Sequence, residues 1–289
     1  MVKERKKSTT KNSADEILKV GNSLVQHGKN SDRVYVMHLE KKDQDVVAQF
    51  IEELVKENNY SKIFIKAESS LAAYFMEKGY ILEARVPGFD LGKTEGLFLG
   101  KFLDEKRAVD KRALDQENIL KSAQKVNFRR SGKKDRPHPQ VCALGKAESS
   151  ELAQLYRKVF ESYPFPIFEP AYLEKTMEDH IAYYGIRIGG KLVAAASAEM
   201  NEQMKNVEMT DFATLNSQRG KGLALELLEA MEADMKQRGF CTAFTICRAL
   251  SLGINRTFFK NGYKHGGTLV NNTHIDGQIE SMHVWYKAL

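Results

Sequence analysis

The sequence has few of the residues that mark secreted, metal-stapled or membrane-spanning proteins. Its three cysteines, at positions 142, 241 and 247, show no paired metal spacing and cannot all pair with one another. This usage favours a reducing, cytoplasmic setting. No stretch approaches the roughly 20 apolar residues that span a bilayer. The Lys-rich N-terminus has no apolar segment behind it. Neither a membrane partner nor a secretory signal is therefore expected.

Neither the histidines nor the excess of basic residues defines a binding site. The seven histidines form no metal-binding pattern, so no metal is predicted. The net charge is +6, and much of the basic excess lies in Lys3–Lys11 and Lys125–Arg136. A tail and a linker keep such charge solvated, and no nucleic-acid-binding motif accompanies it. We expect no nucleic-acid partner. The length of 289 residues and the apolar fraction of 42% suit an enzyme of about two domains.

The second half of the chain contains a strand, a glycine loop and a helix in succession. Val207–Leu215 alternates like a strand, and Leu223–Arg238 carries apolar residues at helical spacing. Between them, residues 216–224 read Asn-Ser-Gln-Arg-Gly-Lys-Gly-Leu-Ala. The two glycines allow a tight turn, and the first amide groups of the helix face an anion along its dipole. Arg219 and Lys221 add positive charge. The loop therefore predicts binding of a pyrophosphate.

The loop fits neither a Rossmann fingerprint nor a Walker loop. Arg219–Ala224 instead matches Gln/Arg-x-x-Gly-x-Gly/Ala, the acyl-CoA loop of the GNAT acetyltransferases, and Thr257–Tyr263 resembles the signature that ends the last helix of that family. The resemblance implies an α/β GNAT fold, in which helices flank a mixed, mostly antiparallel central sheet. It also implies acetyl-CoA as the acetyl donor. The residues expected to bind it are Phe212, Ala213, Thr214, Arg219, Gly220, Lys221, Gly222, Leu223, Ala224, Ser251 and Phe258.

Two acidic residues on the strand before the loop are the candidate catalytic groups. Glu208 occupies the position of the general base in histone-type members of the superfamily. Asp211 would point into the apolar face by strict alternation, but a bulge would redirect it. Either acid could instead attract a cationic amine. The backbone amides around 212–214 are expected to stabilise the oxyanion, with direct transfer in a ternary complex.

Phe258 departs from the family pattern, which places a tyrosine there in many members as the acid for the departing thiolate. We expect Phe258 to pack against the pantetheine arm or in the core. A thiol has a pKa of about 8.5, roughly two units below that of the amine, so CoA can leave without a general acid. Cys247 has no His partner visible in the sequence, and a covalent acetyl-cysteine is not expected.

The N-terminal half repeats the order of elements in the C-terminal half. We expect a disordered basic tail over 1–30 and a degenerate GNAT-like α/β domain over 31–103. A charged helical linker over 104–139 and a catalytic GNAT domain over 140–289 follow. The first copy lacks a glycine between Leu39 and Val46. It is therefore expected to be structural or to mediate a homodimer.

Beyond the superfamily, much of the chain resembles the β-lysine acetyltransferases. The segments that carry the resemblance are Met37–Ala108, Glu208–Ala224, Arg248–Ser251, Gly266–Asn272 and Ile279–Lys287. It implies acetylation of the ε-amino group of β-lysine to make a compatible solute, with a lysine 2,3-aminomutase as pathway neighbour.

The substrate is then a small amine that carries a carboxylate and a second ammonium group. The residues expected to bind it are Phe165, Glu169, Asn271, Asn272 and Glu280. Two other readings stay open: another cationic amine as acceptor (lysine, a polyamine or a protein lysine), or a non-catalytic CoA-binding scaffold.

Overall fold

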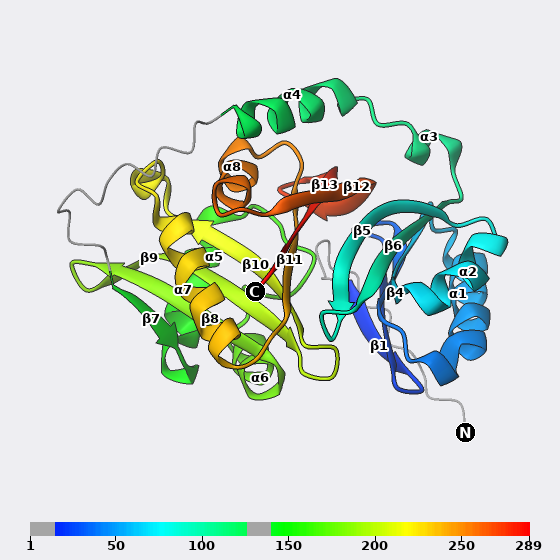
Figure 1. Cartoon of the computed structure of the whole chain (residues 1–289), viewed down its shortest axis with the longest axis horizontal. Helices are drawn as coiled ribbons and strands as arrows, with labels where there is room; N and C mark the ends of the chain where they lie inside the picture. The colour runs from blue at the N-terminus through cyan, green and yellow to red at the C-terminus, as the bar shows by residue number, and fades with distance from the viewer. Residues whose placement is uncertain (1–14, 126–139) are drawn as a thin grey trace.

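The structure, a computed structural model, describes residues 15–125 and 140–289 (Figure 1). The N-terminal half contains β1 (Glu16–Val20), β2 (Ser23–Gly28), β3 (Arg33–His38), α1 (Gln44–Asn58), β4 (Lys62–Glu68), α2 (Ser69–Glu77), β5 (Ile81–Asp90) and β6 (Thr94–Phe102). The linker contains α3 (Glu105–Ala108) and α4 (Ala113–Gln124). Residues 1–14 and 126–139, predicted as tail and linker, lie outside the described residues.

The C-terminal half has the order of elements expected of the GNAT fold. Its elements are β7 (Val141–Leu144), α5 (Ser149–Val159), α6 (Pro170–Asp179), β8 (Ile181–Ile188), β9 (Lys191–Asn201), β10 (Asn206–Thr214), α7 (Leu223–Gln237), β11 (Thr242–Arg248), α8 (Leu252–Lys260), β12 (Lys264–Ile275) and β13 (Gln278–Ala288). Short 3₁₀ turns precede three of the helices: η1 (Lys41–Asp43), η2 (Lys146–Glu148) and η3 (Asn216–Gln218).

The prediction of a disordered tail over residues 1–30 was wrong for its second half. β1 and β2 form an antiparallel hairpin, and β2 continues the sheet by pairing with β3. Gly21, with φ of +62°, makes the turn, and Val25 is fully buried in the N-terminal core. The Lys-rich composition of the first residues obscured this short strand signal.

The described strands form one sheet of 13, and its two halves follow the same topology. In the first half β3 runs parallel to β4, which pairs antiparallel with β6, and β6 pairs with β5. In the second half β10, β11, β13 and β12 have the same relationships in the same order. The halves join where Ala84 of β5 pairs with Gly267 of β12. Figure 1 shows this junction between the two lobes.

The two halves also pack face to face. One face of the N-terminal sheet is covered by α1 and α2. The other face presents Tyr35, Phe64 and Phe98, which pack with Phe244 and Val284 of the C-terminal part of the sheet. Because buried apolar area stabilises by roughly 25 cal/mol per Å², this second core holds the lobes together. The N-terminal half therefore covers part of one face of the C-terminal sheet.

The helices of the C-terminal half leave one part of its sheet uncovered, on the side of the N-terminal half. α7 and α8 pack on one face of the catalytic sheet, over the core that contains Leu227 and Met231. α5 and α6 cover the β7–β9 side of the opposite face. The middle of that face, at β10 and β11, lies toward the N-terminal half. No helix among the described residues is long and apolar enough to cross a membrane.

Candidate active site

The strands β10 and β11 diverge in the middle of the catalytic sheet. They pair in parallel only from Asn206 with Thr242 to Glu208 with Phe244. Beyond these pairs, residues 209–214 of β10 and 245–248 of β11 have no ladder between them in the described structure. Amide groups of β10 that point away from β9 therefore have no strand partner, and such groups seek other acceptors. Phe212, Ala213 and Thr214 lie in this part of the strand.

The glycine loop lies directly after the divergent strand. Gly220 and Gly222 have φ of +77° and +86°, and a Cβ added to either would meet no atom within 4 Å. No acceptor in the described part of the chain is recorded for the amide groups of 220–224. Arg219 and Lys221 are exposed beside them. Positive φ, free amides and basic side chains fit a diphosphate at the start of α7. Leu223 is a core residue, so it and half-buried Ala224 offer only backbone there.

Glu208 is buried and faces a lysine from the other half of the chain. Its Oε2 lies 3.3 Å from Nζ of Lys66 on β4. Burial raises the pKa of Glu208 to about 7, although Lys66 opposes the rise. Burial also acts to lower the pKa of Lys66, but Tyr35 and Glu208 outweigh it and raise that pKa. The pair therefore holds a protonated lysine against a carboxyl group that titrates near neutral pH, the range suited to a general base.

Asp211 is turned onto the same face of the sheet by a bulge. The register of β10 with β9 shifts between Thr210 and Ala213, and Asp211 has φ of +54°. Its carboxylate accepts hydrogen bonds from Ser197 Oγ at 2.6 Å and from Tyr163 OH at 2.5 Å. Burial raises the pKa of Asp211, against these bonds. The bulge that the sequence analysis considered is therefore present.

The groups around the two acids favour a cation. Glu199 of β9 is part-exposed and raises the pKa of both acids through its charge. The three carboxyl groups are those of Glu208, Asp211 and Glu199. Lys66 balances one of them through its ion pair with Glu208. Tyr163 adds an aromatic wall. An ammonium group entering here meets excess negative charge, which attracts it.

Cys247 and Phe258 belong to the core. Phe258 is fully buried, with its ring centroid 5.5 Å from that of Phe212. Phe258 was expected either against the pantetheine arm or in the core, and it lies in the core. Burial raises the pKa of Cys247, which keeps the thiol protonated. His283, which the sequence did not suggest, lies opposite Cys247 on the neighbouring strand. Both side chains contact Oδ1 of Asn255. Burial lowers the pKa of His283 to about 3. A neutral pair of this kind cannot supply a thiolate.

Three of the predicted substrate residues have other partners. Glu169 is exposed and forms an ion pair with Arg157 at 3.6 Å. Glu280 is buried and bound by Arg248 at 2.7 Å. The Asn271 amide donates to the carbonyls of Arg107 and Val109 in the linker. In this structure the three side chains bind other protein groups, and their roles toward a substrate stay predictions.

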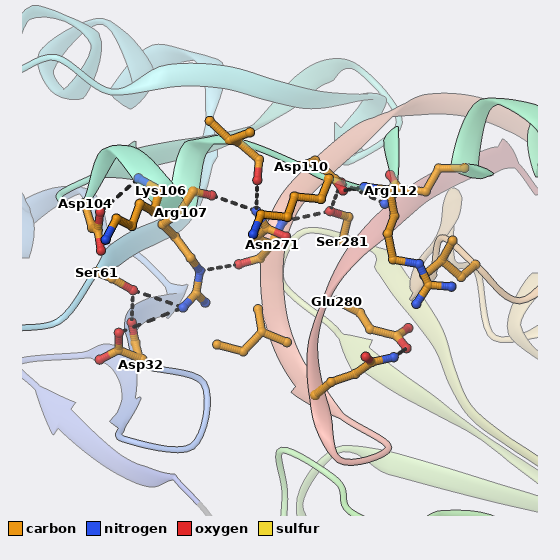
Figure 2. A pocket seen from close by; sticks show the side chains of 16 residues that line it. Asp32, Ser61, Asp104, Lys106, Arg107, Asp110, Arg112, Asn271, Glu280 and Ser281 are labelled. Atoms are coloured by element: carbon orange, nitrogen blue, oxygen red, sulfur yellow. Dashed lines mark hydrogen bonds and ion pairs between the residues drawn. The ribbon is translucent and has the colours of Figure 1, made fainter. Parts of the chain in front are cut away.

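Asn271 and Glu280 line a cavity of about 420 Å³ between the linker and the β12–β13 hairpin. Figure 2 shows Asn271, Arg107 and Ser281 converging there through hydrogen bonds. The residues that line this cavity do not include Glu208 or Asp211. Its polar groups largely bind one another, so it fastens the linker to the hairpin.

The remaining predicted residues take different places. Phe165 packs against the core under α5 and α6, in the loop that carries Tyr163. Ser251 is the half-buried N-cap of α8, directly after β11. Asn272 is buried between the two halves of the chain and bonds Arg33 through its carbonyl at 2.7 Å.

The groups that surround Glu208 and Asp211 were not predicted from the sequence. They are Lys66, Tyr35, Tyr163, Ser197 and Glu199. One signal was available for Lys66. β4 reads Lys-Ile-Phe-Ile-Lys-Ala-Glu, with lysines at both ends of an apolar run. Lysine in a buried strand requires a partner, and buried charge is rare without one.

Comparison with known proteins agrees with this geometry. The family model "Acetyltransferase (GNAT) family" matches residues 149–263. A β-lysine N(6)-acetyltransferase of Methanococcus maripaludis is 36% identical over 94% of this chain and 98% of its own length. The chain belongs to the GNAT acetyltransferase family.

Two further similarities are more distant or concern the fold. N-acetyltransferase YodP of Bacillus subtilis is 31% identical over 92% of this chain and 96% of its own length. The ribosomal-protein-S18-alanine N-acetyltransferase of Escherichia coli is similar in structure, with 13% identity and a TM-score of 0.46 over 52% of this chain and 94% of that one. This GNAT enzyme therefore belongs to a family that takes acetyl groups from acetyl-CoA.

Proposed function

We propose that this acetyltransferase transfers an acetyl group from acetyl-CoA to the ε-amino group of β-lysine. The observation that carries the proposal is the acidic cluster of Glu208, Asp211 and Glu199 at the point where β10 and β11 diverge. The cluster suits a cationic amine, and the 36% identity with a β-lysine N(6)-acetyltransferase supports this amine. In a cytoplasmic pathway, a lysine 2,3-aminomutase would supply the β-lysine and the product would serve as a compatible solute.

In the proposed reaction, the chain binds and orients two substrates at the divergent strands. The amides of 220–224, with Arg219 and Lys221, hold the diphosphate of the donor. Acetyl-CoA supplies a thioester carbon that the amine attacks. Backbone amides of Phe212–Thr214 stabilise the negative charge that develops on the carbonyl oxygen.

Before this attack, Glu208 accepts a proton of the substrate ammonium. An ammonium group has a pKa of about 10.4 in water and must lose a proton before it can attack. The raised pKa of Glu208, about 7, makes it a stronger base than an ordinary carboxylate while leaving it partly ionised at neutral pH. Asp211 orients Tyr163 and contributes charge to the amine site. The thiolate of CoA leaves without help from Phe258, and Cys247 forms no bond to the acetyl group.

The test is the consumption of acetyl-CoA by the purified full chain with synthetic β-lysine, and with lysine, spermidine and a lysine-containing peptide for comparison. We expect β-lysine to have the highest kcat/KM and mass spectrometry to locate the acetyl group on the ε-nitrogen. Glu208→Gln should lower kcat by about 10²–10⁴-fold, the usual contribution of a general base.

Two results would contradict the proposal in different ways. Faster acetylation of the peptide or of spermidine would assign another cationic amine as acceptor. Tight binding of acetyl-CoA without turnover on any of these amines would make the chain a CoA-binding scaffold, and Glu208→Gln would then change nothing.

A further inference from the structure

The described residues contain one buried basic side chain that has no counter-ion. Four basic side chains are buried there. Three pair with carboxylates: Lys62 with Glu83, Lys66 with Glu208 and Arg107 with Asp32. Arg33, which is 3% exposed, has no carboxylate within 4.0 Å among the described residues. Asp15 and Glu83 act on its pKa only from further away, and burial lowers that pKa to about 10. A buried charge without a partner is costly, so the site favours an anion.

The guanidinium of Arg33 is anchored at one nitrogen and largely unpaired along one buried edge. Its Nη1 donates to the carbonyl of Asn272 at 2.7 Å and to Thr273 Oγ1 at 3.0 Å. Its Nη2 reaches only Gln26 Oε1, at 3.4 Å, and its Nε has no partner. The Nε–Nη2 edge is a fork of two parallel donors, the geometry that binds both oxygens of a carboxylate. The anchor fixes the direction in which this fork points.

A second unpaired group belongs to the residue that anchors Arg33. Oδ1 of Asn272 is buried and has no hydrogen-bond donor in the described structure, while the carbonyl of the same residue holds Arg33. A buried amide oxygen without a donor is rare in a folded protein. An unpaired donor fork on one residue and a free acceptor on the residue that anchors it complement a carboxylate and an ammonium group on one ligand. A β-amino acid carries these two groups one methylene apart.

We propose that Arg33 binds the carboxylate of the acceptor and that Asn272 binds its 3-ammonium group. This assignment rests on the proposed function and adds to it a head-group site on the N-terminal half. Of the two residues, only Asn272 was expected to bind substrate from the sequence.

The spacing along β3 and β4 agrees with the length of such a substrate. The Arg33 guanidinium lies 4.9 Å from the centroid of the Tyr35 ring, and Lys66 Nζ lies 5.6 Å from the same centroid. The proposed head-group site and the lysine that contacts Glu208 therefore both lie against the same aromatic ring. An extended six-carbon diamino acid spans roughly 7 Å between its ends, from bond lengths of about 1.5 Å.

The loop between α5 and α6 connects the two ends of this path. Tyr163 OH donates to Asp211, and the next carbonyl, of Pro164, accepts from Gln26 Nε2 at 3.0 Å. Gln26 is also the residue that Nη2 of Arg33 reaches. The loop thus contacts both the acidic cluster and the neighbour of the unpaired fork. It covers both ends of the substrate in the proposed complex.

The experiment compares β-lysine with 1,4-diaminopentane, which is the same diamine without the carboxylate. For the wild type we expect kcat/KM to favour β-lysine by at least about 10-fold, because the charged fork of Arg33 binds the carboxylate that 1,4-diaminopentane lacks. Arg33→Gln removes the charged fork and should bring the ratio close to one. The control is Arg85→Gln, which removes an exposed arginine of the same half that pairs with Glu95. It should leave the ratio unchanged.

A second variant tests the site even if Arg33→Gln does not fold. Asn272→Asp keeps the side-chain shape and supplies the counter-ion that Arg33 lacks. We expect its kcat/KM for β-lysine to fall at least about 10-fold while its Tm rises, because the new carboxylate occupies the fork. A merely structural Asn272 would not combine a rise in Tm with lost selectivity.

The outcomes separate this inference from the proposed function. A wild type that acetylates both diamines equally leaves amine acetylation in place and overturns the head-group site. A ratio that survives both Arg33→Gln and Asn272→Asp also overturns it. A wild type that acetylates neither diamine overturns the proposed function and this inference with it.

Discussion

Replacing Lys66 by methionine should shift the pH dependence of catalysis, because Lys66 opposes the rise in the pKa of Glu208. Two unit charges 4 Å apart interact by about 4 kcal/mol at an effective dielectric constant of 20. The two groups lie 3.3 Å apart, where the same relation gives about 5 kcal/mol, and both side chains are largely buried. One pKa unit corresponds to about 1.36 kcal/mol, which sets an upper limit of roughly four units. Water entering the vacated space reduces the shift, so we expect at least about one unit upward.

The assay is kcat/KM for β-lysine measured from pH 5 to 10. In the wild type, activity should fall with acidity below the Glu208 pKa of about 7, as the base becomes protonated. In Lys66→Met the same fall should begin at least about one unit higher. Lys66→Arg keeps the charge and should restore the wild-type profile.

Stability should depend on pH through the same carboxyl group, with a sign fixed by its raised pKa. The folded state binds the Glu208 proton more tightly than the unfolded state, whose pKa is near the ordinary 4.5. The resulting contribution to the free energy of unfolding is fully present below pH 4.5 and is lost as pH rises through about 7. In Lys66→Met the loss should extend to higher pH, which thermal unfolding at a series of pH values would detect.

Lys62→Met is the matched control. Lys62 lies on the same face of β4, is fully buried and pairs with Glu83 at 2.8 Å. Its loss should destabilise the protein by a few kcal/mol, about 3–5 for a broken buried pair, without moving the acidic limb of the activity profile. Equal shifts in the two variants, or none in Lys66→Met, would refute the assignment of Glu208 as the base that Lys66 controls.

Three further substitutions test other parts of the structure. Gly222→Val places a branched side chain at φ of +86° in the space left for the diphosphate, and steady-state kinetics should show the KM for acetyl-CoA raised at least about 10-fold. Gly267→Ala puts a Cβ 2.2 Å from the carbonyl oxygen of Glu83, so chemical denaturation should show a loss of about 1–3 kcal/mol, larger than that of Gly189→Ala, where the Cβ meets nothing. Cys247→Ala should keep kcat within about twofold, since the thiol is protonated and buried; a loss resembling that of Glu208→Gln would reinstate covalent transfer.

The parts of the molecule that depend on local pattern could be predicted from the sequence. The strand before the loop, the glycine turn and the helix after it are encoded within residues 206–237, where hydrophobic period and turn residues agree. The bulge at Asp211 was expected because this strand has one in the superfamily that the chain resembles, and strict alternation would have buried a carboxylate among apolar side chains. The bulge lies at Asp211 itself, so the residue that breaks the alternation and the backbone change that accommodates it are next to each other in the sequence.

The partners of the acids could not be predicted in this way, because they come from distant segments. Lys66 reaches Glu208 across 142 positions of sequence, and Arg33 reaches Asn272 across 239. Such contacts depend on how β5 meets β12, which no local period encodes. The same limit applies to Glu280 and Asn271, whose protein partners are Arg248 and the linker.

Because the two halves of the chain share one strand topology, the protein resembles a dimer of two similar domains fused into one chain, with different features retained in each half. One copy keeps the anion-binding turn, while at the matching turn of the other the Asp43 carboxylate bonds the backbone of Asn22. Freed from binding a donor of its own, that copy can change its inward-facing side chains to suit an acceptor. Acceptor preference can thus evolve on one half while the donor site on the other is conserved.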